Sequence, residues 1–337
     1  MILIWLEFIL CSAVIVYCGS KLSKYGDVIA EKTGLGRAWI GLVLMASVTS
    51  LPELITGISS VAIADVPNIA LGDIMGSCVF NLSIIALMDI LHGRKPIFSE
   101  SEHGHILSAG FGIILISLAS ISIMANANIP AIGHIGLYSP AIIVIYFIGI
   151  RGVFLFERRR IKEFVGEMAQ TIQYDHITTR EAVVKYSINA LFIIGVATWL
   201  PFIGDRIAEE TSLGRSFVGT VFIALTTSLP EVVVSIAALK IGATDMAIAN
   251  LFGSNIFNIF ILAIDDIFYT KGPILAHVSM NHAVTGFMAV LMTGIAVVGL
   301  TYRLEKKAFL RLGWDAVAII IAYLVNIYIL YSLRGQG

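Results

Sequence analysis

Ten long apolar segments recur along the chain, and they constrain its fold more than any other feature of the sequence. Each is long enough to form an α-helix across a hydrocarbon core, which takes about 20 mainly apolar residues. Charged residues make up only 13% of the 337 residues, against about a quarter in a soluble domain. The segments run approximately over 2–20, 38–64, 68–91, 105–124, 131–151, 183–204, 216–239, 244–269, 279–301 and 313–332. The sequence therefore predicts an all-α integral membrane protein with about ten transmembrane helices.

The basic residues predict how these helices are oriented. Short cytoplasmic loops of membrane proteins carry an excess of Lys and Arg. Alternate loops hold 18 of the 22 basic residues, including Arg158, Arg159 and Arg160, and the loops of the other side hold four. We therefore expect a multi-pass protein of the cell (plasma) membrane with both termini outside. The first segment contains Glu7 and its lysines follow it, so we interpret it as a span and not as a signal peptide.

Composition and missing motifs exclude several classes of function. A net charge of −1 without an extended basic face does not fit a nucleic-acid-binding protein. The three cysteines, Cys11, Cys18 and Cys78, lie in apolar segments and form no C-x-x-C pair, so neither a disulfide framework nor a zinc site is indicated. Neither H-E-x-x-H nor G-x-S-x-G occurs, and we predict that the protein is not an enzyme and needs no cofactor.

An internal repeat divides the chain into two halves. The segment Thr49-Ser50-Leu51-Pro52-Glu53 recurs as Thr227-Ser228-Leu229-Pro230-Glu231, and a G-S-x-x-x-N motif at 76–81 recurs at 253–258. The offsets are 178 and 177 residues. We expect a first five-helix repeat at 1–156, with its motif region at 41–91, a basic cytoplasmic linker at 157–182, and a second repeat at 183–337, with its motif region at 219–269. Because each half has an odd number of spans, the two copies enter the membrane in opposite orientations, as in many secondary transporters.

The prolines of the repeated motif predict broken helices. Pro52 and Pro230 have no N–H to donate, so carbonyl groups near Val48 and Thr226 lose their helical partners. Within a membrane such groups need another partner, and a cation or an enclosed polar cavity can supply it. A lone proline in a membrane helix is often only a kink, but a glutamate at mid-span is usually functional.

The polar side chains of the two motifs are oxygen donors at helical spacing. Thr49, Ser50 and Glu53 fall within one helical turn. Ser77 and Asn81 are four residues apart, and the second half repeats both arrangements. No thiol or histidine belongs to the set, which favours hard cations such as Na⁺ and Ca²⁺ over zinc or copper.

These motifs resemble those of the cation/Ca²⁺ antiporter superfamily, in particular of the sodium/calcium exchanger type. The resemblance covers the whole length and implies a fold of ten helices with a 5+5 inverted-topology repeat. It makes Glu53 and Glu231 the central carboxylates of one cation site. It also implies that the first and sixth spans slide against a stiffer core. The further site residues that it implies are Thr49, Ser50, Ser77, Asn81, Thr227, Ser228, Ser254 and Asn258, with the backbone carbonyls of Ala46 and Ala224.

The chain departs from the family pattern at several of these positions. Both Asn81 and Asn258 are amides, whereas one of the two is frequently an acid in members that exchange Na⁺. Asp73 stands where the family usually has an asparagine, four residues before Ser77. We therefore add Asp73 to the candidate site, with the hypothesis that it raises the negative potential there.

The charge of the site favours exchange over a one-way pore. Two carboxylates in a cavity of low dielectric constant are neutralised by one Ca²⁺, by two or three Na⁺ or by two protons. We therefore predict Ca²⁺/Na⁺ antiport, with Ca²⁺/H⁺ antiport or exchange of another divalent cation as the alternatives and a cation channel as a weaker one. Outside the motifs, Glu7, Asp89, Asp265 and Asp266 are interpreted as polar contacts between helices or at their ends in preference to cation ligands.

Overall fold

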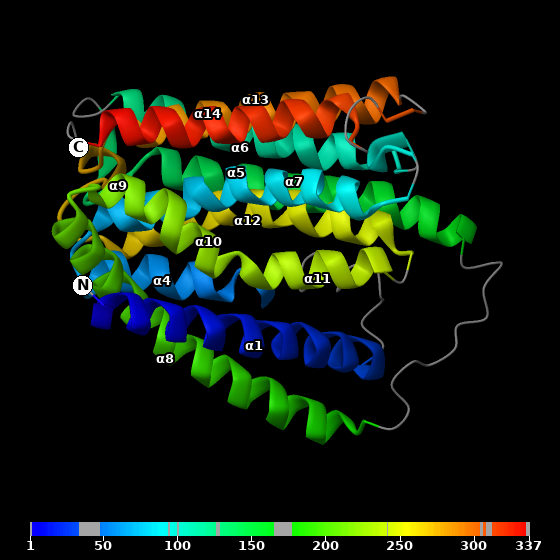
Figure 1. The fold of residues 1–337 in the computed structure, drawn as a ribbon, viewed down its shortest axis with the longest axis horizontal. Helices are drawn as coiled ribbons and strands as arrows, with labels where there is room; N and C mark the ends of the chain where they lie inside the picture. Colours follow the sequence, from blue (N-terminus) through cyan, green and yellow to red (C-terminus); the bar gives the residue numbers. More distant parts are fainter. Residues whose placement is uncertain are drawn as a thin grey trace.

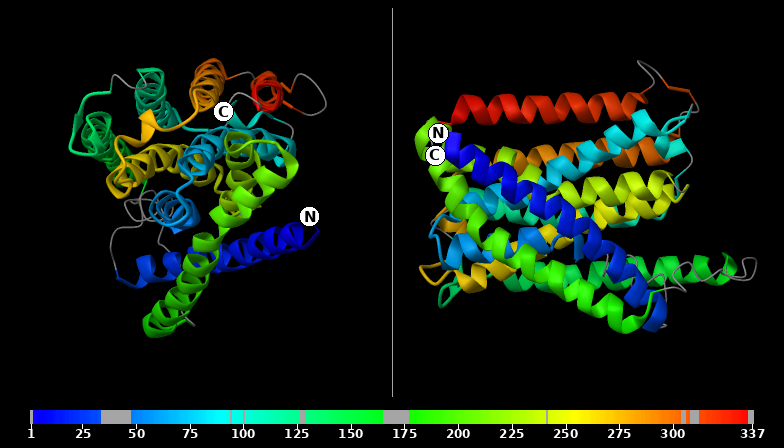
Figure 2. Two further views of the ribbon diagram at one scale, coloured as in Figure 1. Left: turned by 90° about the vertical axis from the view of Figure 1, so that its left-hand side faces the viewer. Right: turned by 60° about the horizontal axis from the view of Figure 1, so that its bottom comes forward.

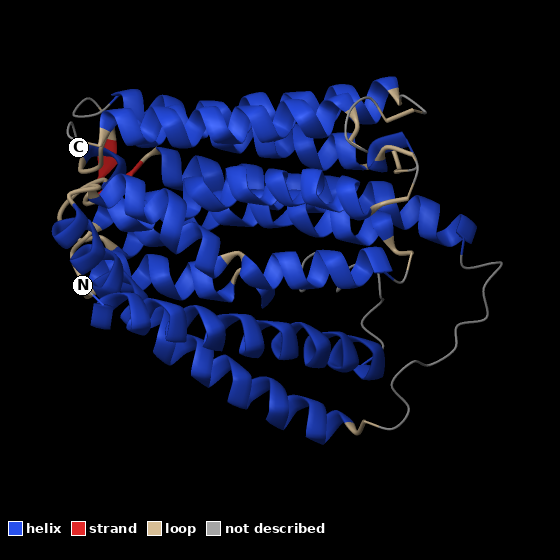
Figure 3. Ribbon diagram, in the orientation of Figure 1, coloured by secondary structure: helices blue, strands red, loops and turns tan. Residues whose placement is uncertain are grey.

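The computed structural model describes residues 2–33, 48–93, 95–99, 101–125, 129–164, 177–240, 242–303, 306–307 and 312–334. Helices make up most of this part of the chain (Figures 1 and 3). The α-helices are α1 (Ile2–Thr33), α4 (Leu51–Ala62), α5 (Pro67–Leu91), α6 (His105–Ala125), α7 (Tyr138–Phe164), α8 (Thr179–Thr211), α9 (Arg215–Val218), α10 (Ala224–Thr227), α11 (Leu229–Lys240), α12 (Thr244–Phe268), α13 (Asn281–Tyr302) and α14 (Trp314–Leu333). The shorter elements are the 3-10 helices η2 (Ile97–Ser99) and η5 (Ile274–Ala276), the π-helix η4 (Gly219–Ile223), and the strands β1 (Ala131–Ile132) and β2 (Ile135–Gly136).

The described helices confirm a multi-pass membrane protein. Eight of them are long and apolar enough to cross a membrane, and a ninth span consists of the segments Arg215–Thr227 and Leu229–Lys240 with a bend of 43° between them. The span predicted at 38–64 is represented by α4, while residues 34–47 lie outside the described part. The predicted number of ten is therefore not established by these residues.

The predicted span at 131–151 is wrong at its beginning. Residues 131–136 form the antiparallel hairpin β1–β2, in which Ala131 pairs with Gly136, and Gly133 turns the chain with a positive φ of 64°. The membrane-spanning part is Tyr138–Phe156. Hydropathy does not separate the two elements, because the isoleucines of the hairpin are as apolar as those of the helix.

Two central helices carry the core of the bundle. Within their apolar spans 72% of the residues of α5 and 78% of those of α12 are buried, against 28–50% for the other long single helices. The two helices pack against each other and against α4 and α11, and α12 also packs against α6. By contrast, α1 and α8 lie side by side on one side of the bundle, as Figures 1 and 2 show. Both ends of the described chain, the start of α1 and the end of α14, lie at the same end of the bundle (Figure 1).

Both repeated motifs interrupt a helix at the same residue. Ser50 precedes α4 with φ −87° and ψ 17°, and Ser228 separates α10 from α11 with φ −87° and ψ 6°. The proline two positions later lies in the first turn of the new helix, where its missing N–H costs no hydrogen bond. The structure thus confirms the broken helices that the motif predicts.

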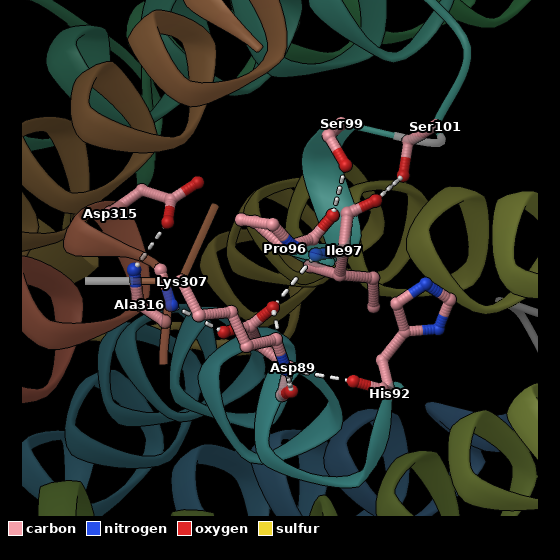
Figure 4. Close-up of polar contacts among 10 residues, drawn as sticks. Asp89, His92, Pro96, Ile97, Ser99, Ser101, Lys307, Asp315 and Ala316 are labelled. Atoms are coloured by element: carbon pink, nitrogen blue, oxygen red, sulfur yellow. Dashed lines mark hydrogen bonds and ion pairs between the residues drawn. The ribbon is translucent and has the colours of Figure 1, made fainter. Parts of the chain in front are cut away.

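Asp89 connects the end of α5 to two neighbouring segments at the end of the bundle opposite the chain termini. Near the end of α5 its carboxylate accepts hydrogen bonds from the backbone N–H groups of Ile97 and Gly313, both at 2.7 Å. Figure 4 shows the carboxylate between Ile97 and Lys307, and the ammonium group of Lys307 lies 3.7 Å from it. The side chain of Asp89 therefore fastens both the turn after α5 and the start of α14.

Asp266 does the same at the other end of the bundle. Its carboxylate accepts the backbone N–H of Ile274 at 2.7 Å and that of Gly136 at 2.9 Å. These three residues are each 177 positions from one member of the Asp89 cluster, which is the offset of the repeat. Two further donors, the hydroxyl groups of Tyr138 and Ser139, contact the same carboxylate at 2.5 Å. The two clusters are thus counterparts at opposite ends, as an inverted repeat requires.

Candidate cation site

The two repeated glutamates lie fully buried where the broken helices meet the central helices. Glu53 is in the first turn of α4 and Glu231 in the first turn of α11. Both carboxylates lie near the N-terminus of their helix, where the helix dipole favours negative charge. Each carboxylate also lies within hydrogen-bonding distance of a serine from the other repeat. The two halves of the chain therefore bring their matched acids to one place.

Each glutamate is held by a hydroxyl group from the other repeat. Ser50 donates to Oε1 of Glu231 at 3.1 Å, and Ser228 donates to Oε1 of Glu53 at 3.0 Å. The hydroxyl oxygen of Ser77 on α5 lies 2.8 Å from that of the same Ser228. These crossed contacts join five of the predicted site residues across the repeat boundary.

Further hydroxyl groups from the surrounding helices contact the carboxylates of Glu231 and Asp73. Ser254 on α12 donates to Oε1 of Glu231 at 3.4 Å, and Thr49 hydrogen-bonds to the same carboxylate. On the other side Thr227 donates to Oδ1 of Asp73 at 2.7 Å, and Ser77 lies 3.5 Å from that oxygen. Asp73 is therefore part of the same network.

The asparagines of the second motif lie between α5 and α12. Asn81 donates to the side-chain oxygen of Asn255 at 3.0 Å, and Asn255 donates to the carbonyl of Cys78 at 3.1 Å. Asn258 is fully buried as well. Asn255 was not among the predicted site residues, because its counterpart in the first half is Cys78 and a search for matched polar residues passes over it. The sequence feature that could have identified Asn255 is its position inside the G-S-x-x-x-N motif at 253–258.

Oxygen atoms without a hydrogen-bond partner gather at these residues. In the described part of the chain, both glutamates leave Oε2 buried and unpartnered, and Asp73 leaves Oδ2. The side-chain oxygens of Asn81 and Asn258 are also buried and without a hydrogen-bond partner among the described residues. Buried polar atoms are nearly always paired, so a cluster of unpaired oxygens fits the ligands of a cation.

Only one of the two backbone ligands that the resemblance implies, Ala224, lies within the described residues. Ala46 lies outside the described residues. The carbonyl of Ala224 accepts the N–H of Ser228 at 3.1 Å, and the hydroxyl oxygen of Thr227 lies 3.3 Å from it, so its role toward a cation stays a prediction. Nearby, the hydroxyl of Thr226 lies 3.0 Å from that of Ser12 on α1, which connects the outer helix to the broken one.

The acids outside the motifs occupy different environments. Asp89 and Asp266 hold loops, as expected for polar contacts at helix ends, and Glu7 forms an ion pair with Arg206 at 2.9 Å between α1 and α8. Asp265 is different, because neither of its oxygens has a hydrogen-bond partner within the described ranges. Across those ranges no group of three or more His, Cys, Asp or Glu side chains is arranged to hold a metal ion.

Comparison with known proteins identifies the family to which the chain belongs. The family model described as sodium/calcium exchanger protein matches residues 3–156 and 186–332. The chain belongs to the sodium/calcium exchanger family. It is therefore a multi-pass membrane protein of the transporter class and not an enzyme, with cation/Ca²⁺ exchange as its type of activity.

Relatives in this family share about a quarter of their residues with the chain. The inner membrane protein YrbG of Escherichia coli is 26% identical over 74% of both chains. The sodium/calcium exchanger MaX1 of Methanosarcina acetivorans is 24% identical, and the match covers 92% of this chain and 93% of that one.

A solved structure of the sodium-calcium exchanger NCX_Mj has the same fold. It superimposes with a TM-score of 0.62 and 20% identity, covering 97% of this chain and 99% of that one. This likeness confirms the inverted-repeat membrane fold that the repeated motifs predict.

Proposed function

We propose that the protein is a secondary active antiporter that exchanges Ca²⁺ for Na⁺ at one site between Glu53 and Glu231. The crossed contacts of Ser50 with Glu231 and of Ser228 with Glu53 support this proposal most directly. A site built from both inverted halves can face either side of the membrane as the halves rearrange, which is the basis of alternating access.

The donor set fits hard cations. Ca²⁺ takes six to eight oxygen ligands, and carboxylate, hydroxyl and amide oxygens are all suitable. The predicted ligands are Glu53, Glu231, Thr49, Ser50, Thr227, Ser228, Ser77, Ser254, Asn81 and Asn258, with Asp73 beside them. Because Ca²⁺ and Na⁺ would use the same oxygens, they would compete, and this competition couples the two fluxes.

Two other exchange reactions use the same residues. Two protons also neutralise the glutamate pair, so Ca²⁺/H⁺ antiport is the first alternative, and exchange of another divalent cation is the second. A channel is a weaker candidate because two matched half-sites of opposite orientation favour alternating access over a continuous pore. Single-channel current in a planar bilayer would support the channel.

Uptake of radioactive Ca²⁺ into proteoliposomes tests the proposal. We expect uptake when an outward Na⁺ gradient is imposed and its loss in Glu53→Gln and Glu231→Gln, because each substitution removes a charge and an oxygen ligand. Uptake driven only by a pH gradient would instead support the alternative of Ca²⁺/H⁺ antiport. If neither gradient drives Ca²⁺ flux, the proposed substrate is wrong.

Asp73 is proposed to raise the negative potential of this site. Its carboxylate lies in the hydrogen-bond network of Thr227 and Ser77 and adds a third acid to the two glutamates. We expect Asp73→Asn to weaken the apparent affinity for the transported cations by about tenfold, the lower end of what one buried charge contributes. An Asp73→Asn protein with unchanged ion dependence would count against this role.

A further inference from the structure

Asp265 is a buried acid that the proposed site does not use. It lies one turn before the end of α12 and has no exposed surface. Neither Oδ1 nor Oδ2 has a hydrogen-bond partner among the residues that the structure describes. Its neighbour in sequence, Asp266, accepts four hydrogen bonds. Of these two adjacent aspartates, Asp266 therefore holds neighbouring segments through hydrogen bonds, whereas Asp265 makes no such bond to a described residue.

The carboxylate of Asp265 packs directly against the backbone of α4. A Cβ atom at Gly57 would lie 2.7 Å from Oδ1 and closer still to Oδ2, so only glycine leaves room for this side chain. Gly57 is four residues beyond Glu53 on the same helix, which places it one turn farther along. Asp265 thus lies about one turn from the central site. The end of α12, to which it belongs, lies at the end of the bundle that carries the chain termini (Figure 1).

The charged neighbours of Asp265 are themselves acids. Asp73 on α5 and Asp266 on α12 act on it electrostatically. Further titratable side chains on elements packed against α12 include Glu53 on α4, Glu231 and Lys240 on α11, Tyr138, Tyr146 and Arg151 on α7, and His105 on α6. Asp265 therefore adds a further acid to Asp73 and the two glutamates of the central site.

A buried charge without a partner is strongly unfavourable. Transfer of an isolated carboxylate out of water costs far more than the stability of a domain, so such a group takes up a compensating positive charge. Ca²⁺ needs six or more oxygens, whereas one carboxylate beside a helix backbone offers two. A single positive charge fits this position better.

We propose that Asp265 binds one monovalent cation, Na⁺ or a proton, on the path between the central site and the end of the bundle that carries the termini. This inference rests on the proposed exchange function, because the cation would be the counter-ion or a proton that moves with it. Occupation of Asp265 then lowers the negative potential that the incoming cations meet, and couples their binding to the concentration of the monovalent cation on that side.

Two flux measurements on Asp265→Asn test the proposal. The first is Ca²⁺ uptake in proteoliposomes, measured over a series of Na⁺ concentrations at fixed pH and over a series of pH values at fixed Na⁺. The second is Ca²⁺/Ca²⁺ exchange, which needs no monovalent counter-ion. We expect the half-maximal Na⁺ concentration or the half-maximal proton concentration to shift by about tenfold, within the usual range of coupling between sites, while Ca²⁺/Ca²⁺ exchange stays within about twofold. The series that shifts identifies the cation.

Three variants control the interpretation. Asp65→Asn removes an exposed acid at the same end of the bundle and should leave both series unchanged. Gly57→Ala should alter the same series as Asp265→Asn, because the added methyl group displaces the carboxylate. Asp265→Met introduces the residue that stands at the matching position 88 of the first repeat, and it repeats the test if the asparagine variant folds poorly.

Unchanged Na⁺ and pH series in folded Asp265→Asn and Asp265→Met proteins would overturn the inference. So would a parallel loss of Ca²⁺/Ca²⁺ exchange, since Asp265 would then act on the central site itself. A wild-type protein without Ca²⁺ flux in any condition would instead refute the proposed function, so the two failures are distinguishable.

Discussion

At the scale of single residues, the exchange of hydroxyl groups between the two repeats is the central feature. Ser50 and Ser228 are the residues at which the helices break, and each has its side chain on the glutamate of the other repeat. Because the break orients the hydroxyl, backbone geometry and ligand geometry depend on the same residue. A cation bound between the glutamates would therefore contact both halves of the molecule.

The first prediction concerns these two serines. We expect Ser50→Ala and Ser228→Ala each to weaken cation binding by about tenfold, because a hydrogen bond to a charged group contributes about 1.5–3 kcal/mol. The Ca²⁺ dependence of uptake measures this change. Ser59→Ala, which removes a hydroxyl bonded to the backbone of α8, serves as the control and should have a smaller effect. Normal affinity in both serine variants would contradict the crossed arrangement.

The residues also show where the sequence is informative and where it is not. Matched motifs identify Glu53 and Glu231 because each copy supports the other. The adjacent acids Asp265 and Asp266 look alike in the sequence, and both were interpreted as polar contacts. A rotation of about 100° per helical residue turns Asp266 toward backbone donors and Asp265 toward Gly57, and no local pattern reveals which neighbour each one meets.

At the scale of elements, α1 and α8 differ from the rest of the bundle. They pack extensively against each other, and the ion pair of Glu7 with Arg206 joins them. Their contacts with the site run through the broken segments, since Ser12 on α1 meets Thr226 on α10 and Ser59 on α4 meets the Thr198 carbonyl on α8. This arrangement suits a pair of helices that moves as one body against the central helices.

A disulfide between α1 and α10 tests this movement. The hydroxyl oxygens of Ser12 and Thr226 are 3.0 Å apart, so cysteine sulfurs at these positions come within reach of a bond of about 2.05 Å. In a background with Cys11, Cys18 and Cys78 replaced by alanine, we expect oxidation of the double-cysteine protein to abolish Ca²⁺ uptake and reduction to restore it. Each single-cysteine protein should respond to neither treatment. Full uptake with the disulfide formed would show that α1 need not move.

The loops fastened by Asp89 and Asp266 supply a stability prediction. Replacing Asp266 by alanine leaves the buried N–H groups of Gly136 and Ile274 without an acceptor, and we expect a loss of about 3 kcal/mol or more in unfolding free energy. Asp89→Ala should behave similarly. The thermal unfolding midpoint of purified protein in detergent measures the effect, with exposed Asp65→Asn as the reference, since asparagine tolerates the positive φ of this position. Equal midpoints for all three proteins would refute a structural role of the pair.

At the scale of the whole molecule, charges are distributed unequally between the two ends. The four basic residues predicted to lie outside are all engaged locally. Arg206 pairs with Glu7, Arg215 with Asp205, Lys271 with Asp65, and the guanidinium of Arg334 lies 3.8 Å from the ring centre of Tyr331. Three acids thus offset three of the four basic residues at that end. The predicted orientation itself rests on the number of Lys and Arg residues in the loops, to which neighbouring acids contribute little.

The orientation decides which compartment Asp265 responds to. We predict that the end with the termini faces outward, and single cysteines in the cysteine-free background test this. Glu209 and Lys306 are exposed side chains at opposite ends of the bundle, at the end of α8 and between α13 and α14. In intact cells a membrane-impermeant maleimide should label Glu209→Cys at once, and Lys306→Cys only after the cells are opened. If the labelling is reversed, the termini lie inside and Asp265 responds to the cytoplasmic monovalent cation. The monovalent cation would then have to be varied on the opposite side of the membrane to change its binding to Asp265.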